Sequence, residues 1–163
     1  MDEEIEIQIM DIQKSLTQTQ NYAIVLGVKD SSMRMPIVIG TFEAQAIAVF
    51  FEQMIPAAPS THDVFALLGT HLDFKVTKAV ITGFVEEVFQ SSIFITQGDK
   101  NIAIPVRTSD AIAIAIRFYA PIYVKKFVLD AAVVMIQEHE PQAENWLQRI
   151  GRKFKAMLLF WSN

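Results

Sequence analysis

Six short segments rich in β-branched and aromatic residues constrain this fold more than any other feature, because they fall into two groups of three. The first group starts with Ile5, Ile7 and Ile9, which alternate with polar residues as a half-buried strand does. Two apolar segments, 22–28 and 35–39, follow on either side of a polar turn. The second group comprises residues 74–84, 88–96 and 101–106. We therefore predict two three-stranded meanders.

The first strand group is followed by two segments with helical spacing of apolar residues. One helix is expected over 42–54, with Thr41 as its N-cap. Two prolines then interrupt the chain. A short second helix is expected from Thr61, as a second capping residue, to near Gly69.

The second strand group has its own helices. Thr108-Ser109-Asp110 is expected to cap a helix that runs to Arg117, and a short strand over 121–124 and a helix over 126–136 follow. Groups of strands that are each followed by helices favour an α+β fold over a doubly wound one. We predict a mixed, mainly antiparallel sheet with helices packed on one face.

The one boundary expected in this chain lies near residues 138–141. We predict a main domain over residues 1–137 and a C-terminal amphipathic helical extension over 138–163. Its apolar stripe comprises Trp146, Leu147, Ile150, Phe154, Met157, Leu158 and Trp161. Since such a stripe is costly to leave in water, it is expected to dock on its own domain or on a sister subunit of a homodimer or higher homo-oligomer. A membrane surface or another partner stays open as an alternative.

Composition limits the compartment and the chemistry. The chain of 163 residues is 52% apolar and 20% charged, which suits a packed core. It has no cysteine, so disulfides, thiolate zinc sites and a cysteine nucleophile are excluded. Without a signal peptide pattern or an apolar run of roughly 18 residues, it is expected to be cytoplasmic with no membrane span. A net charge of −4 gives no overall attraction to nucleic acid, although a local basic site is compatible with it.

Several short motifs resemble a known family. They are Pro36-Ile37-Val38-Ile39-Gly40, Glu43-Ala44-Gln45-Ala46-Ile47-Ala48, Thr61-His62-Asp63, Arg107-Thr108-Ser109-Asp110-Ala111-Ile112-Ala113, Arg117, and Ala120-Pro121-Ile122-Tyr123-Val124. In order and spacing, residues 5–134 are similar to the bifunctional nuclease domain family. Its name comes from plant members credited with cutting both RNA and DNA. The resemblance implies the family's fold, a nuclease-like activity, RNA or DNA as a partner, and a homo-oligomer.

These motifs contain the residue types that phosphodiester hydrolysis requires, which are a cation for the phosphate, a base for the attacking oxygen and often a divalent ion. The candidate catalytic residues are His62, Asp63, Asp110 and Glu43, and the candidate substrate-binding residues are Arg107, Arg117, Thr61 and Ser109. Carboxylate oxygens suit Mg²⁺ or Mn²⁺, for which Asp110, Asp63 and Glu43 are the predicted ligands. His62 could be a ligand or a general base.

Structural roles compete with these assignments. Glu43, Asp63 and Asp110 all fall in predicted first helical turns, where a carboxylate interacts with the helix dipole by roughly 0.3–1 kcal/mol. Arg117 near a helix C-terminus has the corresponding structural role, and Ser109 can simply cap its helix.

A second function therefore stays open, namely a non-catalytic binding or regulatory module with the same fold. Two positions favour it, because Ala58 and Pro105 stand where the family usually has arginine and aspartate. The two functions differ in one spatial requirement. Catalysis requires the candidate residues to converge on a cleft, whereas a module with a drifted site does not.

Overall fold

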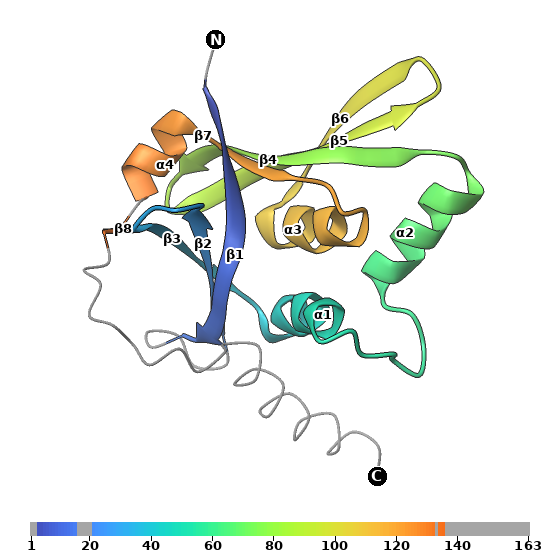
Figure 1. The fold of residues 1–163 in the computed structure, drawn as a ribbon, viewed down its shortest axis with the longest axis horizontal. Helices are drawn as coiled ribbons and strands as arrows, with labels where there is room; N and C mark the ends of the chain where they lie inside the picture. Colours follow the sequence, from blue (N-terminus) through green and yellow to red (C-terminus); the bar gives the residue numbers. More distant parts are fainter. Residues whose placement is uncertain (1–2, 16–20, 133, 136–163) are drawn as a thin grey trace.

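The structure, a computed structural model, describes residues 3–15, 21–132 and 134–135. Its centre is one eight-stranded sheet of order β6-β5-β4-β7-β1-β2-β3-β8 (Figure 1). The strands are β1 Glu4–Lys14, β2 Tyr22–Val28, β3 Met33–Ile39, β4 Lys75–Val85, β5 Val88–Gln97, β6 Lys100–Arg107, β7 Ile122–Lys125 and β8 Val134–Met135. Neighbouring strands are antiparallel except β4 and β7, which run parallel. The predicted mixed, mainly antiparallel sheet is confirmed.

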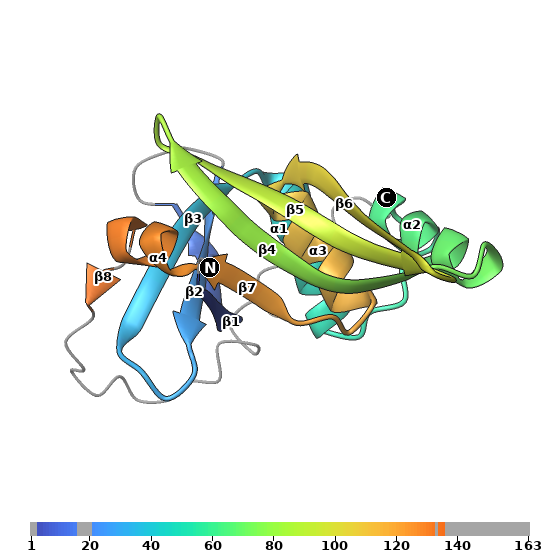
Figure 2. The same ribbon diagram turned by 90° about the horizontal axis from the view of Figure 1, so that it is seen from above.

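The described residues form four helices. They are α1 Thr41–Phe51, α2 Thr61–His71, α3 Thr108–Arg117 and α4 Lys126–Ala132. Figures 1 and 2 show α1, α2 and α3 together on one side of the sheet. α3 lies between the others and contacts α1, α2 and strands β4, β5 and β6, whereas α4 packs on β3, β4 and β7.

Both predicted meanders belong to a single core, because β7 inserts between β1 and β4. The centre of this core is α3, in which all five residues from Ala111 to Ala115 are buried. This middle part of α3 is apolar on every side and needs cover all round, which it receives from the sheet and from the two neighbouring helices. Its alternating alanines leave room for those helices, and each buried isoleucine contributes roughly 1.5–3 kcal/mol.

The starts of the helices differ from the predicted caps by one or two residues. The N-caps of α1 and α2 are Gly40 and Ser60 rather than Thr41 and Thr61. Ser60 forms a capping box with Asp63, since the Ser60 Oγ accepts from the Asp63 N–H at 3.3 Å and the Asp63 carboxylate accepts from the Ser60 N–H at 2.7 Å. The carboxylate three residues after Ser60 explains why the serine, and not the adjacent threonine, caps the helix.

The start of α3 also differs from the prediction. Its N-cap is Arg107, without a side-chain capping bond, so the predicted capping by Ser109 is wrong. Thr108 instead holds this end of the helix to β5. Its buried hydroxyl lies 2.7 Å from the Ser91 hydroxyl and donates to the Phe89 carbonyl at 3.1 Å.

The first three helices end in the same way. The residue after each C-cap has a left-handed backbone, with φ of 50° at Gln53, 54° at Asp73 and 54° at Tyr119. The next amide bonds back to the last turn in a Schellman motif: Met54 to the Val49 carbonyl at 3.1 Å, Phe74 to Gly69 at 2.9 Å and Ala120 to Ala115 at 2.9 Å. Glycine is usual at this position, because a side chain there costs roughly 1–2 kcal/mol.

The C-terminal part differs from the sequence prediction in one described feature. The helix predicted over 126–136 is too long, because α4 ends at Ala132 and β8 pairs with β3 through Met135 and Met33. The predicted extension over 138–163 lies outside the described residues. Within the described part of the chain, no helix combines the length and apolar character needed to cross a bilayer.

Candidate active site

A cavity of about 930 Å³ lies among α1, the loop that leads to α2, the first turns of α2, and the side of α3 that carries Asp110, Ile114 and Arg117. Its volume falls in the range typical of ligand sites, roughly 300–1,000 Å³. Seven of the eight candidate residues line it: Glu43, Thr61, His62, Asp63, Arg107, Asp110 and Arg117. Ser109 is not among the lining residues. Residues from four separate motifs therefore converge on one cavity.

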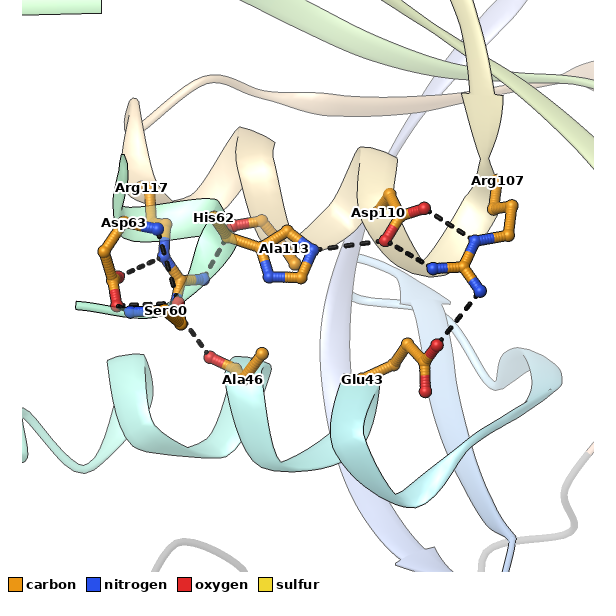
Figure 3. A network of polar contacts seen from close by, with 9 residues as sticks. All are labelled: Glu43, Ala46, Ser60, His62, Asp63, Arg107, Asp110, Ala113 and Arg117. Carbon is orange, nitrogen blue, oxygen red and sulfur yellow. Dashed lines mark hydrogen bonds and ion pairs between the residues drawn. The ribbon is translucent and has the colours of Figure 1, made fainter. Parts of the chain in front are cut away.

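Four of these residues form a connected group, which we call the outer cluster: Glu43, His62, Arg107 and Asp110 (Figure 3). Arg107 donates to both oxygens of Asp110, from Nε at 2.7 Å and from Nη2 at 3.1 Å. Its Nη1 donates to Glu43 at 3.1 Å, which links the starts of α1 and α3. The arginine side chain is still 70% exposed, so most of its surface can meet a ligand.

His62 completes the outer cluster. Its Nε2 lies 3.2 Å from Asp110 Oδ1, so the carboxylate is placed between an imidazole and a guanidinium. Burial acts to raise the pKa of Asp110, but the hydrogen bonds and charges of Arg107 and His62 outweigh it and hold that pKa below its usual value. Asp110 in turn raises the pKa of Arg107. An ionised Asp110 can accept the Nε2–H of His62 and orient the ring.

Ser60, Asp63 and Arg117 form a second group, which we call the inner cluster. The Arg117 side chain is only 4% exposed. It donates from Nε to Asp63 at 2.6 Å, from Nη1 to the Ala113 carbonyl at 2.9 Å and from Nη2 to the Ala46 carbonyl at 3.0 Å. One guanidinium thus joins α1, α2 and α3.

Asp63 is held from two sides within the inner cluster. Besides Arg117, it accepts from the Ser60 amide and hydroxyl, each at 2.7 Å. Burial acts to raise the pKa of Asp63, but the hydrogen bonds from Ser60 and Arg117 prevail and lower it. These contacts indicate that the inner cluster positions the walls of the cavity.

The residues at the cavity lie within a region that matches a known protein family. A sequence model of the bifunctional nuclease domain matches residues 24–137, a range that contains all seven candidate residues at the cavity. The chain belongs to the bifunctional nuclease domain family. Two relatives, uncharacterised proteins from the CDC 1551 and H37Rv strains of Mycobacterium tuberculosis, are each 32% identical over 156 residues, covering 94% of this chain and 92% of theirs.

The predicted Mg²⁺ or Mn²⁺ ligands of this bifunctional nuclease domain do not form one donor set. Asp63 is bound by Ser60 and Arg117, while Glu43 and Asp110 share Arg107. No group of three or more histidine or carboxylate residues in the described ranges is placed to hold a metal ion. The positive charge between the Glu43 and Asp110 carboxylates is supplied by the Arg107 guanidinium and not by a metal ion. The arrangement therefore does not fit a magnesium site. We derive no chemical step through a metal.

Several residues of the cavity were not predicted from the sequence. Ser60 could have been found, because a serine three residues before an aspartate at a helix start is a capping-box signal. Other missed residues are apolar, among them Phe42 and the 97% exposed Ile55, and carry no sequence signal for a site. Two positions differ from the family pattern. Ala58 lines the cavity, whereas Pro105 lies on the edge strand β6, where it pairs with Ser92 of β5.

Proposed function

We propose that this bifunctional nuclease domain binds RNA or DNA in the 930 Å³ cavity and hydrolyses phosphodiester bonds there. The observation that carries the proposal is the contact of His62 and Arg107 with the same carboxylate, Asp110. Together these groups offer a base, an orienting anion and a cation for a phosphate. Membership of the family supports the same class of substrate.

His62 is the general base in this proposal. With its Nε2–H donated to Asp110, the other ring nitrogen, Nδ1, carries a lone pair that can take a proton. The proton comes from a water molecule as its oxygen attacks phosphorus. On RNA the 2′-hydroxyl can attack instead, which gives a 2′,3′-cyclic phosphate that water then opens. The bond from phosphorus to the leaving oxygen then breaks, and that oxygen takes up a proton from solvent or from the imidazolium.

Arg107 is the proposed phosphate contact. A guanidinium has five N–H donors, and three of those on Arg107 are used by Asp110 and Glu43. Two donors remain on a side chain that is 70% exposed. They can bind the phosphate oxygens and stabilise the charge that develops there without breaking the outer cluster.

A non-catalytic binding or regulatory module is the second candidate. The observation in its favour is the charge of the lining, which carries three carboxylates and only two guanidinium groups. These charged groups sum to a net negative charge, which disfavours a polyanion. The position of Ala58 at the cavity, where the family usually has arginine, points the same way.

A cleavage assay tests both candidates. Purified full-length protein is incubated with end-labelled single-stranded and duplex RNA and DNA, in Mg²⁺, Mn²⁺ or EDTA. Cleavage is expected on at least one substrate, and binding without cleavage would favour the regulatory module. Loss of cleavage in EDTA with recovery in Mg²⁺ or Mn²⁺ would support the predicted metal and would require Arg107 to leave the two carboxylates.

We also propose that the protein is a homodimer or higher homo-oligomer, with the stripe from Trp146 to Trp161 as a candidate contact. Light scattering of the full chain and of a form truncated after Pro141 measures this. A lower mass or a lower melting temperature of the truncated form is expected, and an unchanged monomer would contradict it.

A further inference from the structure

A second cavity, of about 420 Å³, adjoins the main one. Both cavities are lined by Asp63 and Arg117, so the inner cluster forms part of their common wall. The other side of the second cavity is formed by the ends of α1 and α3, with Phe50, Gln53 and Tyr119. A ligand in the main cavity could therefore extend across the inner cluster into this one.

The aromatic residues leave ring surface available in the second cavity. The ring centroids of Phe50 and Tyr119 are 5.8 Å apart with 60° between their planes, so the two rings are tilted and not stacked on each other. Arg117 lies over the Phe50 ring, with Cζ 5.9 Å from its centroid. Tyr119 is 86% exposed. Because Phe50 does not stack on the Tyr119 ring, that ring can stack against a planar ligand.

The backbone singles out two residues of the same cavity. Gln53 and Tyr119 occupy the left-handed positions at the ends of α1 and α3, a backbone conformation that glycine adopts most easily. Asp73 has the equivalent position at the end of α2 but does not line the cavity. Since the fold does not require a large side chain at this position, an exposed tyrosine there indicates a role in binding.

We propose that the second cavity binds a nucleobase of the strand whose phosphate lies in the main cavity. The base stacks on Tyr119, and the exposed amide of Gln53 can donate to or accept from its polar edge. A base can reach an aromatic side chain in this way only when it is unstacked, so the substrate is a single strand. This inference rests on the proposed function, because it places the base beside the proposed phosphate site.

Tyr119→Gly tests the proposal without harming the fold, since glycine suits the left-handed backbone. Affinity of the full-length protein for a short, fluorescein-labelled single-stranded oligonucleotide is measured by anisotropy. Stacking of one base is worth enough for Tyr119→Gly to weaken binding by at least about fivefold. Tyr119→Phe keeps the ring and is expected to bind as the wild type does. Asp73→Gly is the matched control, because it places glycine at the equivalent left-handed position outside the cavity. It is expected to leave the affinity for the oligonucleotide unchanged.

A second probe separates this inference from the proposed function. An oligonucleotide with abasic positions keeps the phosphates but lacks the bases at those positions. The wild type is expected to bind it more weakly than the intact strand, whereas Tyr119→Gly is expected to bind the two strands equally. If the wild type binds and cleaves while Tyr119→Gly and the abasic strand behave like their controls, the base site is overturned and the proposed function stands. If the wild type neither binds nor cleaves any strand, both are overturned.

Discussion

The inner and outer clusters use the same pair of residue types in different surroundings. In each, an arginine Nε donates to an aspartate from the first turn of a helix, at 2.6 Å for Arg117 and Asp63 and at 2.7 Å for Arg107 and Asp110. The exposed fraction of the arginine side chain differs, at 4% for Arg117 and 70% for Arg107. Burial, and not residue type, therefore distinguishes the two arginines.

The difference has a physical consequence for their roles. A buried guanidinium must have its donors satisfied, and Arg117 meets this with one carboxylate and two helix carbonyls. Arg107 makes its bonds in contact with solvent and keeps donors for a ligand. The inner cluster thus joins three helices, whereas the proposed function assigns the chemistry to the outer cluster.

Arg117→Ala should have the largest effect. Removing the buried cation leaves Asp63 without its charge partner and removes the hydrogen bonds that tie the Ala46 and Ala113 carbonyls to the guanidinium, which costs about 3 kcal/mol of unfolding free energy. Urea denaturation measures this. Arg107→Ala is the matched control and is expected to change the unfolding free energy by less than about 1 kcal/mol, because its ion pairs are solvent-exposed. Equal losses in the two variants would contradict the division into clusters.

His62→Ala should have the next largest effect, on cleavage and not on folding. Removing a general base lowers the rate by about 100-fold or more. Rates on the best nucleic acid substrate are compared with those of His71→Ala, in which an exposed histidine in the last turn of the same helix is lost. A folded His62→Ala protein that cleaves as fast as His71→Ala would remove His62 from the mechanism.

Arg107→Lys should have a smaller effect. Lysine keeps the positive charge but cannot bind Asp110 through two donors or present a planar fork to phosphate. We expect about a tenfold loss of affinity for nucleic acid, measured by anisotropy, with an unfolding free energy close to that of the wild type. Arg34→Lys, at a site outside the cavity, controls for the substitution itself. Unchanged affinity and rate in Arg107→Lys would contradict a phosphate contact.

Acid should reveal the smallest difference. Because the pKa values of Asp63 and Asp110 are lowered in the folded protein, each aspartate adds stability that is present above the usual aspartate pKa of about 3.9. That stability is lost as pH falls through the lower folded-state values. Urea denaturation from pH 7 to about pH 2 should show a shallower loss below about pH 4 for Asp63→Asn than for the wild type. Parallel pH curves would contradict the assignment.

Local patterns predicted most of the fold. Strands β1 to β6 were found because alternation and turn residues are visible within each segment. The way in which the two groups join into one sheet was not predicted, because it depends on β7 pairing with β4, through residues such as Ile122 and Ala79 that are far apart in sequence. No pattern within either segment carries that information.

The site was predictable to a similar extent. Arg107 and Asp110 lie three residues apart at one helix start, so their contact follows from local geometry. Arg117 and Asp63 come from different helices, and burial of their pair arises only after packing. The left-handed backbone of Tyr119 was also missed, because the usual signal for that position is a glycine.

The central claim is tested most directly by two matched variants, Asp63→Asn and Asp110→Asn, measured for both unfolding free energy and cleavage rate. Asp63→Asn should lose about 2 kcal/mol of stability, through its weakened bonds to Ser60 and Arg117, while the folded protein cleaves at nearly the wild-type rate. Asp110→Asn should cleave about 100-fold more slowly with its stability changed by less than about 1 kcal/mol. Full cleavage by Asp110→Asn, loss of cleavage in folded Asp63→Asn, or a wild type that cleaves nothing would contradict the account.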